Sequence, residues 1–135
     1  MLGEVVVAEN GKGRYQQEVR VGQHVLLADE PESVGGADAG PAPFDFLMAA
    51  LGACTSMTLR MYAERKGLAL TGVSVALSHE KIDLDGVRRD RISRRITLHG
   101  DLDPAQRQRM LEIANKCPVH KTLSQPVLID SELVN

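Results

Sequence analysis

Tryptophan is missing from this sequence of 135 residues, and aromatic side chains make up only 3% of it. The hydrophobic core must therefore be built from aliphatic side chains. The longest run of strictly apolar or small residues, 46–54, is far shorter than the roughly 18 residues that cross a bilayer. The apolar run near the N-terminus is short and begins beside Glu4, which excludes a signal peptide of the usual kind. We therefore expect a cytoplasmic protein without a membrane partner.

Positive charge is not in excess, since the formal net charge is −2. Binding to nucleic acid requires a basic face, so no nucleic-acid partner is expected. Only two cysteines are present, Cys54 and Cys117. In a reducing compartment such cysteines are more often inert core residues or a reactive pair than a permanent disulfide. The length, with 43% hydrophobic and 25% charged residues, predicts one globular domain, 1–135.

The most informative stretch is 43–66, PFDFLMAALGACTSMTLRMYAERK. Pro43 suits the first position of a helix, and Gly67 suits the left-handed residue past its end. Asp45 would lie in the first turn, where the helix dipole favours an anion. Between Asp45 and Arg60 there is no charged side chain, and a helix that is apolar on all sides must be covered on all sides. We expect a central helix that carries a buried thiol.

Strands are expected before and after this helix. Period-two alternation, β-branched residues and turn signals such as Asn10-Gly11 and Asp85-Gly86 define them. The predicted strands are 4–9, 14–21, 24–28, one from Thr71, one through Ile92, Ile96 and Leu98, and 127–134. The stretch 29–41 is rich in glycine, proline and acids and predicts an irregular loop that faces an active site or a dimer partner, or is simply mobile.

A second helix is expected to begin at a capping acid, Asp103, and to carry Cys117 on its apolar face. Pro118 should end this helix and open a short one. The order β-β-β-α-β-β-α-β predicts an α+β fold. Six short strands of one chain cannot cover a long apolar helix, so we predict a homodimer whose sheets wrap both long helices.

The residues alone leave the role of the thiols open. Free cysteine is usually a small buried hydrophobe, yet both cysteine-bearing helices should pack in one core, where the sulfurs can meet. A metal site is not expected, because with His120 the pair offers three soft ligands and structural zinc needs four. The boundary of the short helix should lower the pKa of Cys117, whereas an apolar mid-helix setting should raise the pKa of Cys54 unless an arginine reaches it. Local reasoning therefore names Cys117 as the nucleophile.

Arg94 falls in phase with the apolar residues of its strand. A charge on an inward face lies at the end of a sheet or on a bulge, or else it is paired. General burial statistics favour the edge or bulge.

Two cysteine motifs, GACTSMT and KCPVH, occur with the pattern I-x-x-x-I-x-L-x-G-D-L between them. Together with the segment GPAPFDFLMAALGACTSMTLRMYAERKG they resemble the OsmC-like family of osmotically induced and organic-hydroperoxide-resistance proteins. The resemblance covers nearly the whole chain. It implies two antiparallel β-sheets wrapped around central helices in an intertwined homodimer.

The resemblance also implies thiol-dependent reduction of organic hydroperoxides, without a cofactor and with a dithiol reductant that is a lipoylated protein in one branch. Cys54 would be the peroxidatic residue and Cys117 the resolving one, through a sulfenic acid and a disulfide, which reverses the local assignment. The family's activating arginine comes from the end of the first hairpin, where Arg14 stands. Arg20 and Arg94 are the alternative candidates for this role. The family's orienting glutamate is replaced by Phe44, and Asp45 is the nearest carboxylate.

Four side chains would suit an apolar substrate, although such residues more often belong to the core: Phe44, Phe46, Met48 and Met57. His120 would donate to a sulfenate or bias Cys117, although packing against its own helix end is an equal alternative. Two other functions remain open from the sequence. One is a redox-sensing or apolar-ligand-binding protein with little turnover, and the other is a structural dimer with inert thiols.

Overall fold

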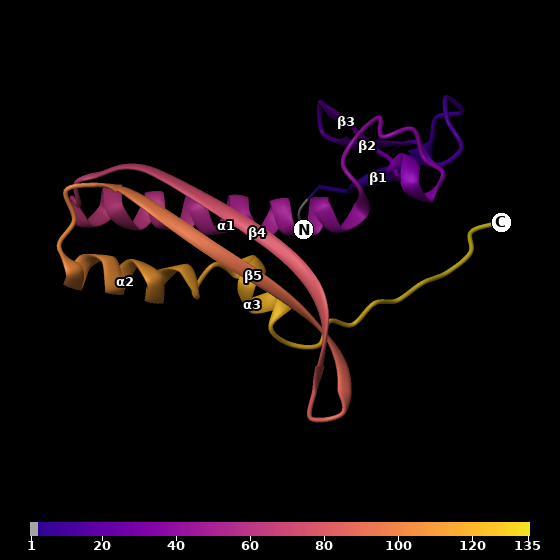
Figure 1. Ribbon diagram of the computed structural model, residues 1–135. Helices are drawn as coiled ribbons and strands as arrows, with labels where there is room; N and C mark the ends of the chain where they lie inside the picture. Colours follow the sequence, from indigo (N-terminus) through magenta and orange to yellow (C-terminus); the bar gives the residue numbers. More distant parts are fainter. Residues whose placement is uncertain (1–2) are drawn as a thin grey trace. The chain divides into compact units, whose positions relative to one another are not determined.

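The computed structural model describes residues 3–135, which form an α+β fold with two antiparallel sheets (Figure 1). The chain divides into two compact units, one up to residue 47 and one from residue 48 onward, and each is described by itself. The division runs through the long helix, so the single domain stays a prediction. Within residues 3–135, no helix has both the length and the hydropathy needed to cross a membrane.

The first unit holds a three-stranded sheet in the order β1-β2-β3. Its strands are β1 (Val6–Glu9), β2 (Gln17–Val21) and β3 (His24–Ala28). Val19 of the middle strand lies opposite Val7 on one side and Leu26 on the other. The predicted antiparallel meander is confirmed, with a second strand that begins three residues later than predicted. Gly22 closes the turn between β2 and β3 with φ 57°, a left-handed value that glycine adopts without strain.

A buried carboxylate, Asp29, organises the loop that follows β3. Asp29 is 3% exposed, and it accepts hydrogen bonds from the N–H groups of Glu30 at 2.8 Å and of Ala37 and Ala39 at 3.1 Å. The Ala39 N–H is the largest influence and lowers the pKa of Asp29; burial opposes it, and the other two N–H groups add to the lowering. The loop also contains a short 3-10 helix, η1 (Glu32–Val34), so it is more regular than predicted.

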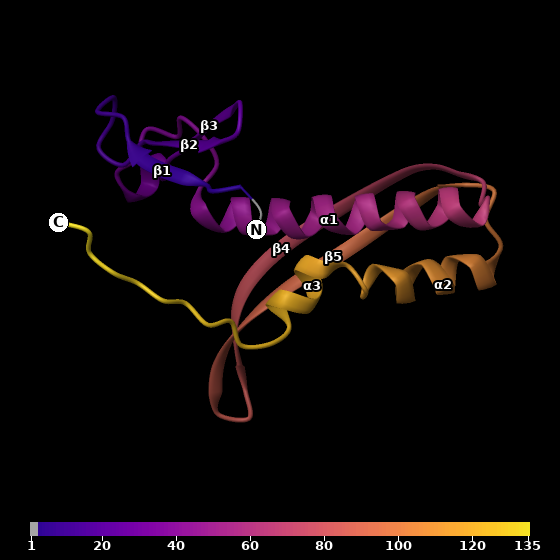
Figure 2. The same ribbon diagram turned by 180° about the vertical axis from the view of Figure 1, so that it is seen from behind.

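The second unit contains most of α1 (Pro43–Lys66) and everything after it. A long antiparallel ribbon of β4 (Leu70–Leu84) and β5 (Val87–Gly100) precedes α2 (Pro104–Ala114) and α3 (Pro118–Leu123). In both views α1 and α2 run alongside this ribbon (Figures 1 and 2). Asp103 caps α2 in a capping box with Gln106, as its sequence predicts. Cys117 lies beyond the end of α2, which corrects its predicted place on that helix.

The core of the second unit lies between α1, the β4–β5 ribbon and α2. Its buried members are Leu59, Ala63, Leu70, Leu102, Met110, Ile113 and Ala114. On α1 the buried residues form one stripe, from Leu51 through Thr55 to Ala63. Met57 and Met61, on another face, are 60% and 62% exposed. Coverage of α1 on all sides, as expected from its sequence, is therefore not achieved within one chain.

The C-terminal segment 126–135 leaves α3 as an extended chain (Figures 1 and 2). The predicted strand 127–134 is wrong for the single chain, because this segment has no strand of the described residues as its ladder partner. Its large apolar side chains consequently stay in solvent: Leu128 is 93%, Ile129 83%, Leu133 91% and Val134 91% exposed.

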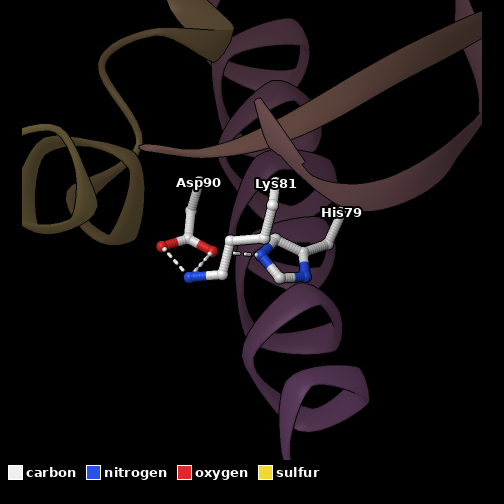
Figure 3. Close-up of polar contacts among 3 residues, drawn as sticks. All are labelled: His79, Lys81 and Asp90. Atoms are coloured by element: carbon white, nitrogen blue, oxygen red, sulfur yellow. Dashed lines mark hydrogen bonds and ion pairs between the residues drawn. The ribbon is translucent and has the colours of Figure 1, made fainter. Parts of the chain in front are cut away.

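A polar cluster crosses the outer part of the ribbon (Figure 3). One carboxylate oxygen of Asp90 lies 2.7 Å from His79 Nε2 and 2.9 Å from Lys81 Nζ. Lys81 stands directly opposite Asp90 in the strand register. The hydrogen bond from Lys81, followed by that from His79, lowers the pKa of Asp90. Opposite charges on facing strands support strand pairing, here in a part of the ribbon that is mostly exposed.

Candidate functional site

The structure brings the two cysteines together. Cys54 lies in the middle of α1 and Cys117 immediately precedes α3, and both thiols are free. Their side chains are in hydrogen-bond contact with each other. Cys54 is half-buried, whereas Cys117 is completely buried. A small molecule from solvent can therefore reach the sulfur of Cys54 more readily.

Cys117 is the N-cap residue of α3. Its Sγ accepts the backbone N–H of His120 at 3.5 Å, and Pro118 follows at the first helical position. Proline is suited to that position because its missing N–H would have no partner inside the helix. The prediction that Cys117 stands at the N-terminal boundary of a short helix is confirmed.

The two thiols have pKa shifts of opposite direction. Burial acts to raise the pKa of Cys54, but hydrogen bonds from Cys117, the Val119 N–H and Thr58, together with the charge of Arg94, bring it below its usual value. Burial, followed by the neighbouring Cys54, raises the pKa of Cys117. The pair therefore ionises first at Cys54. The local inference that Cys117 has the lower pKa is wrong, because burial and tertiary partners outweigh the helix end.

Arg94 extends from β5 to both cysteine-bearing regions. Its Nη1 donates to Thr55 Oγ1 at 2.9 Å and to the Ala114 carbonyl at 3.1 Å, and its Nη2 donates to Asn115 Oδ1 at 2.7 Å. Thr55 is fully buried and donates its own hydroxyl proton to the Leu51 carbonyl at 2.7 Å, which leaves its oxygen to accept from Arg94. Arg94 stands opposite Leu77 in regular register, so the bulge alternative is wrong. Its guanidinium is partly buried and hydrogen-bonded to neutral acceptors.

Arg14 and Asp45 belong to the first unit. The Arg14 guanidinium lies over the ring of Tyr15, 5.0 Å from its centroid. A carboxylate oxygen of Asp45 accepts the Ala42 N–H at 2.9 Å, which orders the chain just before α1. Arg20, another candidate for the activating arginine, forms an ion pair with Glu18 on β2.

The candidate substrate-binding residues are divided between the units. Phe44 and Phe46 belong to the first unit, where Phe44 is 51% exposed and Phe46 is half-buried. Met57 lies on the exposed face of α1 in the second unit. His120 is half-buried in α3, where burial and then the charge of Arg94 lower its pKa, so its ring is neutral at pH 7.

Thr55, Thr58 and Asn115 also belong to the site, although the sequence did not single them out. Thr55 and Thr58 lie inside the motif GACTSMT, and Asn115 stands two residues before Cys117. A hydroxyl beside a cysteine, or one helical turn after it, on an otherwise apolar helix is the signal that would have identified the first two. Among the residues that the structure describes, no group of three or more His, Cys, Asp or Glu side chains is arranged to hold a metal ion.

Comparison with known proteins agrees with the fold. The family model described as OsmC-like protein matches residues 35–132. The structure of an OsmC-like protein from Mycoplasma pneumoniae is similar with a TM-score of 0.76 at 18% identity, covering 92% of this chain and 88% of that one. An organic hydroperoxide resistance protein from Legionella pneumophila has a TM-score of 0.70 at 16% identity, with 91% and 89% covered. The structure of the organic hydroperoxide resistance protein OhrB of Bacillus subtilis has a TM-score of 0.63 at 18% identity, and the match covers 90% of each chain. None of the curated proteins matches this chain.

Proposed function

The chain belongs to the OsmC-like protein family, and on that premise we propose that it reduces organic hydroperoxides to alcohols. Family membership supports a redox-related role, and several structural relatives, among them those from Legionella pneumophila and Bacillus subtilis, are named for organic hydroperoxide resistance. The observation that carries the proposal is the contact between two free thiols with opposite pKa shifts. A pair of inert core cysteines would not require this polar environment.

In the proposed reaction the Cys54 thiolate attacks the distal oxygen of the hydroperoxide. A sulfur–oxygen bond forms, the oxygen–oxygen bond breaks, and the alkoxide leaves with a proton as the alcohol. Cys54 is then a sulfenic acid. The thiolate of Cys117 attacks this sulfur, forms the disulfide and releases hydroxide, which becomes water. A dithiol then reduces the disulfide and is itself oxidised.

The order of the two cysteines follows from access and ionisation. Thiolates, not thiols, are the nucleophiles, and the pKa of Cys54 is the lowered one. Cys54 is also the more accessible sulfur. The proton that Cys117 retains is available to the departing alkoxide, and its loss converts Cys117 into the thiolate needed for the second step. The arrangement supports Cys54 as peroxidatic and Cys117 as resolving residue.

The remaining roles in this proposal come from the family resemblance. Arg14 is proposed to hold the peroxide beside Cys54, with Asp45 in place of the family's glutamate. Phe44, Phe46 and Met57 are proposed to contact an apolar substrate, and His120 to donate to the sulfenate. A dithiol of the lipoyl type and a cytoplasmic location complete the proposal.

The direct test is turnover by the purified protein. With cumene hydroperoxide and dihydrolipoamide, we expect catalytic loss of peroxide and equal formation of alcohol and oxidised dithiol. Mass spectrometry after one equivalent of peroxide without dithiol should show a protein lighter by two hydrogens, with Cys54 linked to Cys117. Stoichiometric oxidation without turnover would instead favour the redox-sensing alternative, and no oxidation at all would contradict both.

We also propose that the chain acts as a homodimer, because one chain leaves extensive apolar surface uncovered. Met57 and Met61 on α1 and the C-terminal side chains are exposed, as are Val25, Leu26 and Leu27 of β3. Monomeric proteins rarely expose large contiguous apolar patches. Both edges of the two-stranded β4–β5 sheet are also free of a further strand among the described residues. A second copy would cover α1 and give the segment 127–134 a strand partner.

Sedimentation equilibrium at micromolar concentration should give the mass of two chains. Leu133→Asp should raise the dissociation constant at least about tenfold, since a buried leucine is worth roughly 1.5–3 kcal/mol. Asn135→Asp adds the same charge at a polar position of the same segment and should change the constant little. A well-folded monomer at these concentrations would contradict the proposed dimer.

A further inference from the structure

The proposed reaction does not account for the hydrogen bonds of one partly buried arginine, Arg94. Arg94 stands among the apolar residues of β5, where Ile96 and Leu98 pack against the core. Desolvating a guanidinium is costly unless its donors are satisfied. Three acceptors from two other segments of the chain receive its hydrogen bonds, one on α1 and two at the end of α2.

The acceptors of Arg94 lie close in the sequence to the two cysteines. Thr55 follows Cys54 directly in α1, and Asn115 stands two residues before Cys117. One planar guanidinium therefore fixes the backbone of α1 relative to the junction of α2 and α3. Its fork of donors has a rigid geometry that a lysine ammonium does not reproduce.

We propose that Arg94 is the positioning residue of the Cys54–Cys117 pair. By holding Thr55 and the Ala114–Asn115 turn together, it keeps Cys117 within bonding reach of Cys54. Its charge, facing the same site, also favours ionisation at Cys54. This inference deepens the proposed function and rests on it for its biological meaning.

The electrostatic surroundings of Cys54 are consistent with this role. The groups that face Cys54 are Thr58 from its own helix, the Cys117 thiol and Val119 N–H from the α3 side, and Arg94 from β5. The charge of Arg94 lowers the pKa of both Cys54 and His120. Because His120 is neutral at pH 7, Arg94 is the permanent positive charge of this group.

The test uses two measurements that need no hydroperoxide. The first is the equilibrium between the reduced pair and its disulfide in glutathione redox buffers, where one glutathione disulfide is reduced to two glutathiones for each protein disulfide formed. The second is the pH profile of Cys54 alkylation by iodoacetamide, located by peptide mass spectrometry. A protein without peroxidase activity would still give both results, so failure of the proposed function and failure of this inference are distinguishable.

At a pH where both thiols are protonated, so that loss of thiolate stabilisation does not offset the geometric effect, Arg94→Met should lower the equilibrium constant for the disulfide at least about tenfold, since small misplacements of reacting groups have large effects. It should also move the alkylation profile of Cys54 to higher pH. Arg94→Lys keeps the charge and should leave the profile closer to that of the wild type, while the disulfide constant still falls. Arg95→Met removes the exposed neighbouring arginine and should leave both measurements within about twofold of wild type.

Circular dichroism and denaturant unfolding establish that each variant is folded. If Arg94→Met does not fold, Asn115→Ala, which removes one exposed acceptor, should lower the disulfide constant severalfold in the same direction. A disulfide constant for Arg94→Met or Asn115→Ala equal to that of Arg95→Met would overturn the proposal.

Discussion

Cys54→Ser should lower kcat/KM for cumene hydroperoxide by at least about a thousandfold, because removal of a nucleophile eliminates the covalent step that the other residues serve. A serine hydroxyl at this position remains protonated at neutral pH, so the hydrogen bonds and charge around Cys54 have no thiolate to stabilise. The measurement is steady-state consumption of dihydrolipoamide, together with a single-turnover experiment in which alcohol is quantified.

Cys117→Ser is the matched control, because it makes the same change on the other sulfur. It should retain a single-turnover burst of about one alcohol per chain and accumulate a sulfenic acid at Cys54 that dimedone traps. Its steady-state rate should fall less than that of Cys54→Ser, since an external thiol can reduce the sulfenic acid directly. A burst in Cys54→Ser that is missing in Cys117→Ser would reverse the assigned roles, and equal rates for wild type and Cys54→Ser would exclude the peroxidase.

The sequence predicted the elements that depend on local signals. The bounds of α1 agree with those predicted from Pro43 and Gly67, and the capping box at Asp103 is present. Both signals act within a few residues of the helix ends. The prediction of a C-terminal strand was wrong for the opposite reason. A strand forms only when it pairs with another strand, and the apolar pattern of a segment does not identify that partner.

The chemistry of the site was less predictable than its location. The cysteine motifs identified Cys54 and Cys117, but the relative pKa values depend on burial and on groups from β5 and the α3 side. Local reasoning considered only the helix end at Cys117 and reached the wrong order. The environment of Arg94 was equally hard to predict. Its phase in the strand placed it on the inward face, but the sequence did not identify its acceptors Thr55 and Asn115.

Leu59→Ala should lower the free energy of unfolding by about 3–5 kcal/mol, the upper part of the usual range for buried leucine. Leu59 is 0% exposed and lies in the core cluster one turn after Thr55. It also lines a hollow of about 250 Å³ with Met110 and Leu98. Removing the side chain would enlarge this space, and the energetic cost grows with the volume that the surroundings do not refill.

Leu111→Ala is the control for this substitution, because it deletes the same atoms from the rim of the same hollow. Leu111 is 51% exposed, so its loss should cost less than about 1 kcal/mol. Urea unfolding followed by circular dichroism measures both values, at one protein concentration because dimerisation would couple to stability. Equal losses for the two variants would mean that Leu59 is not at the centre of the core. A large loss of unfolding free energy for Leu59→Ala alone would support packing of α1 against α2 at the level of Met110. Met110 lies one helical turn before Ala114, whose carbonyl accepts a hydrogen bond from Arg94.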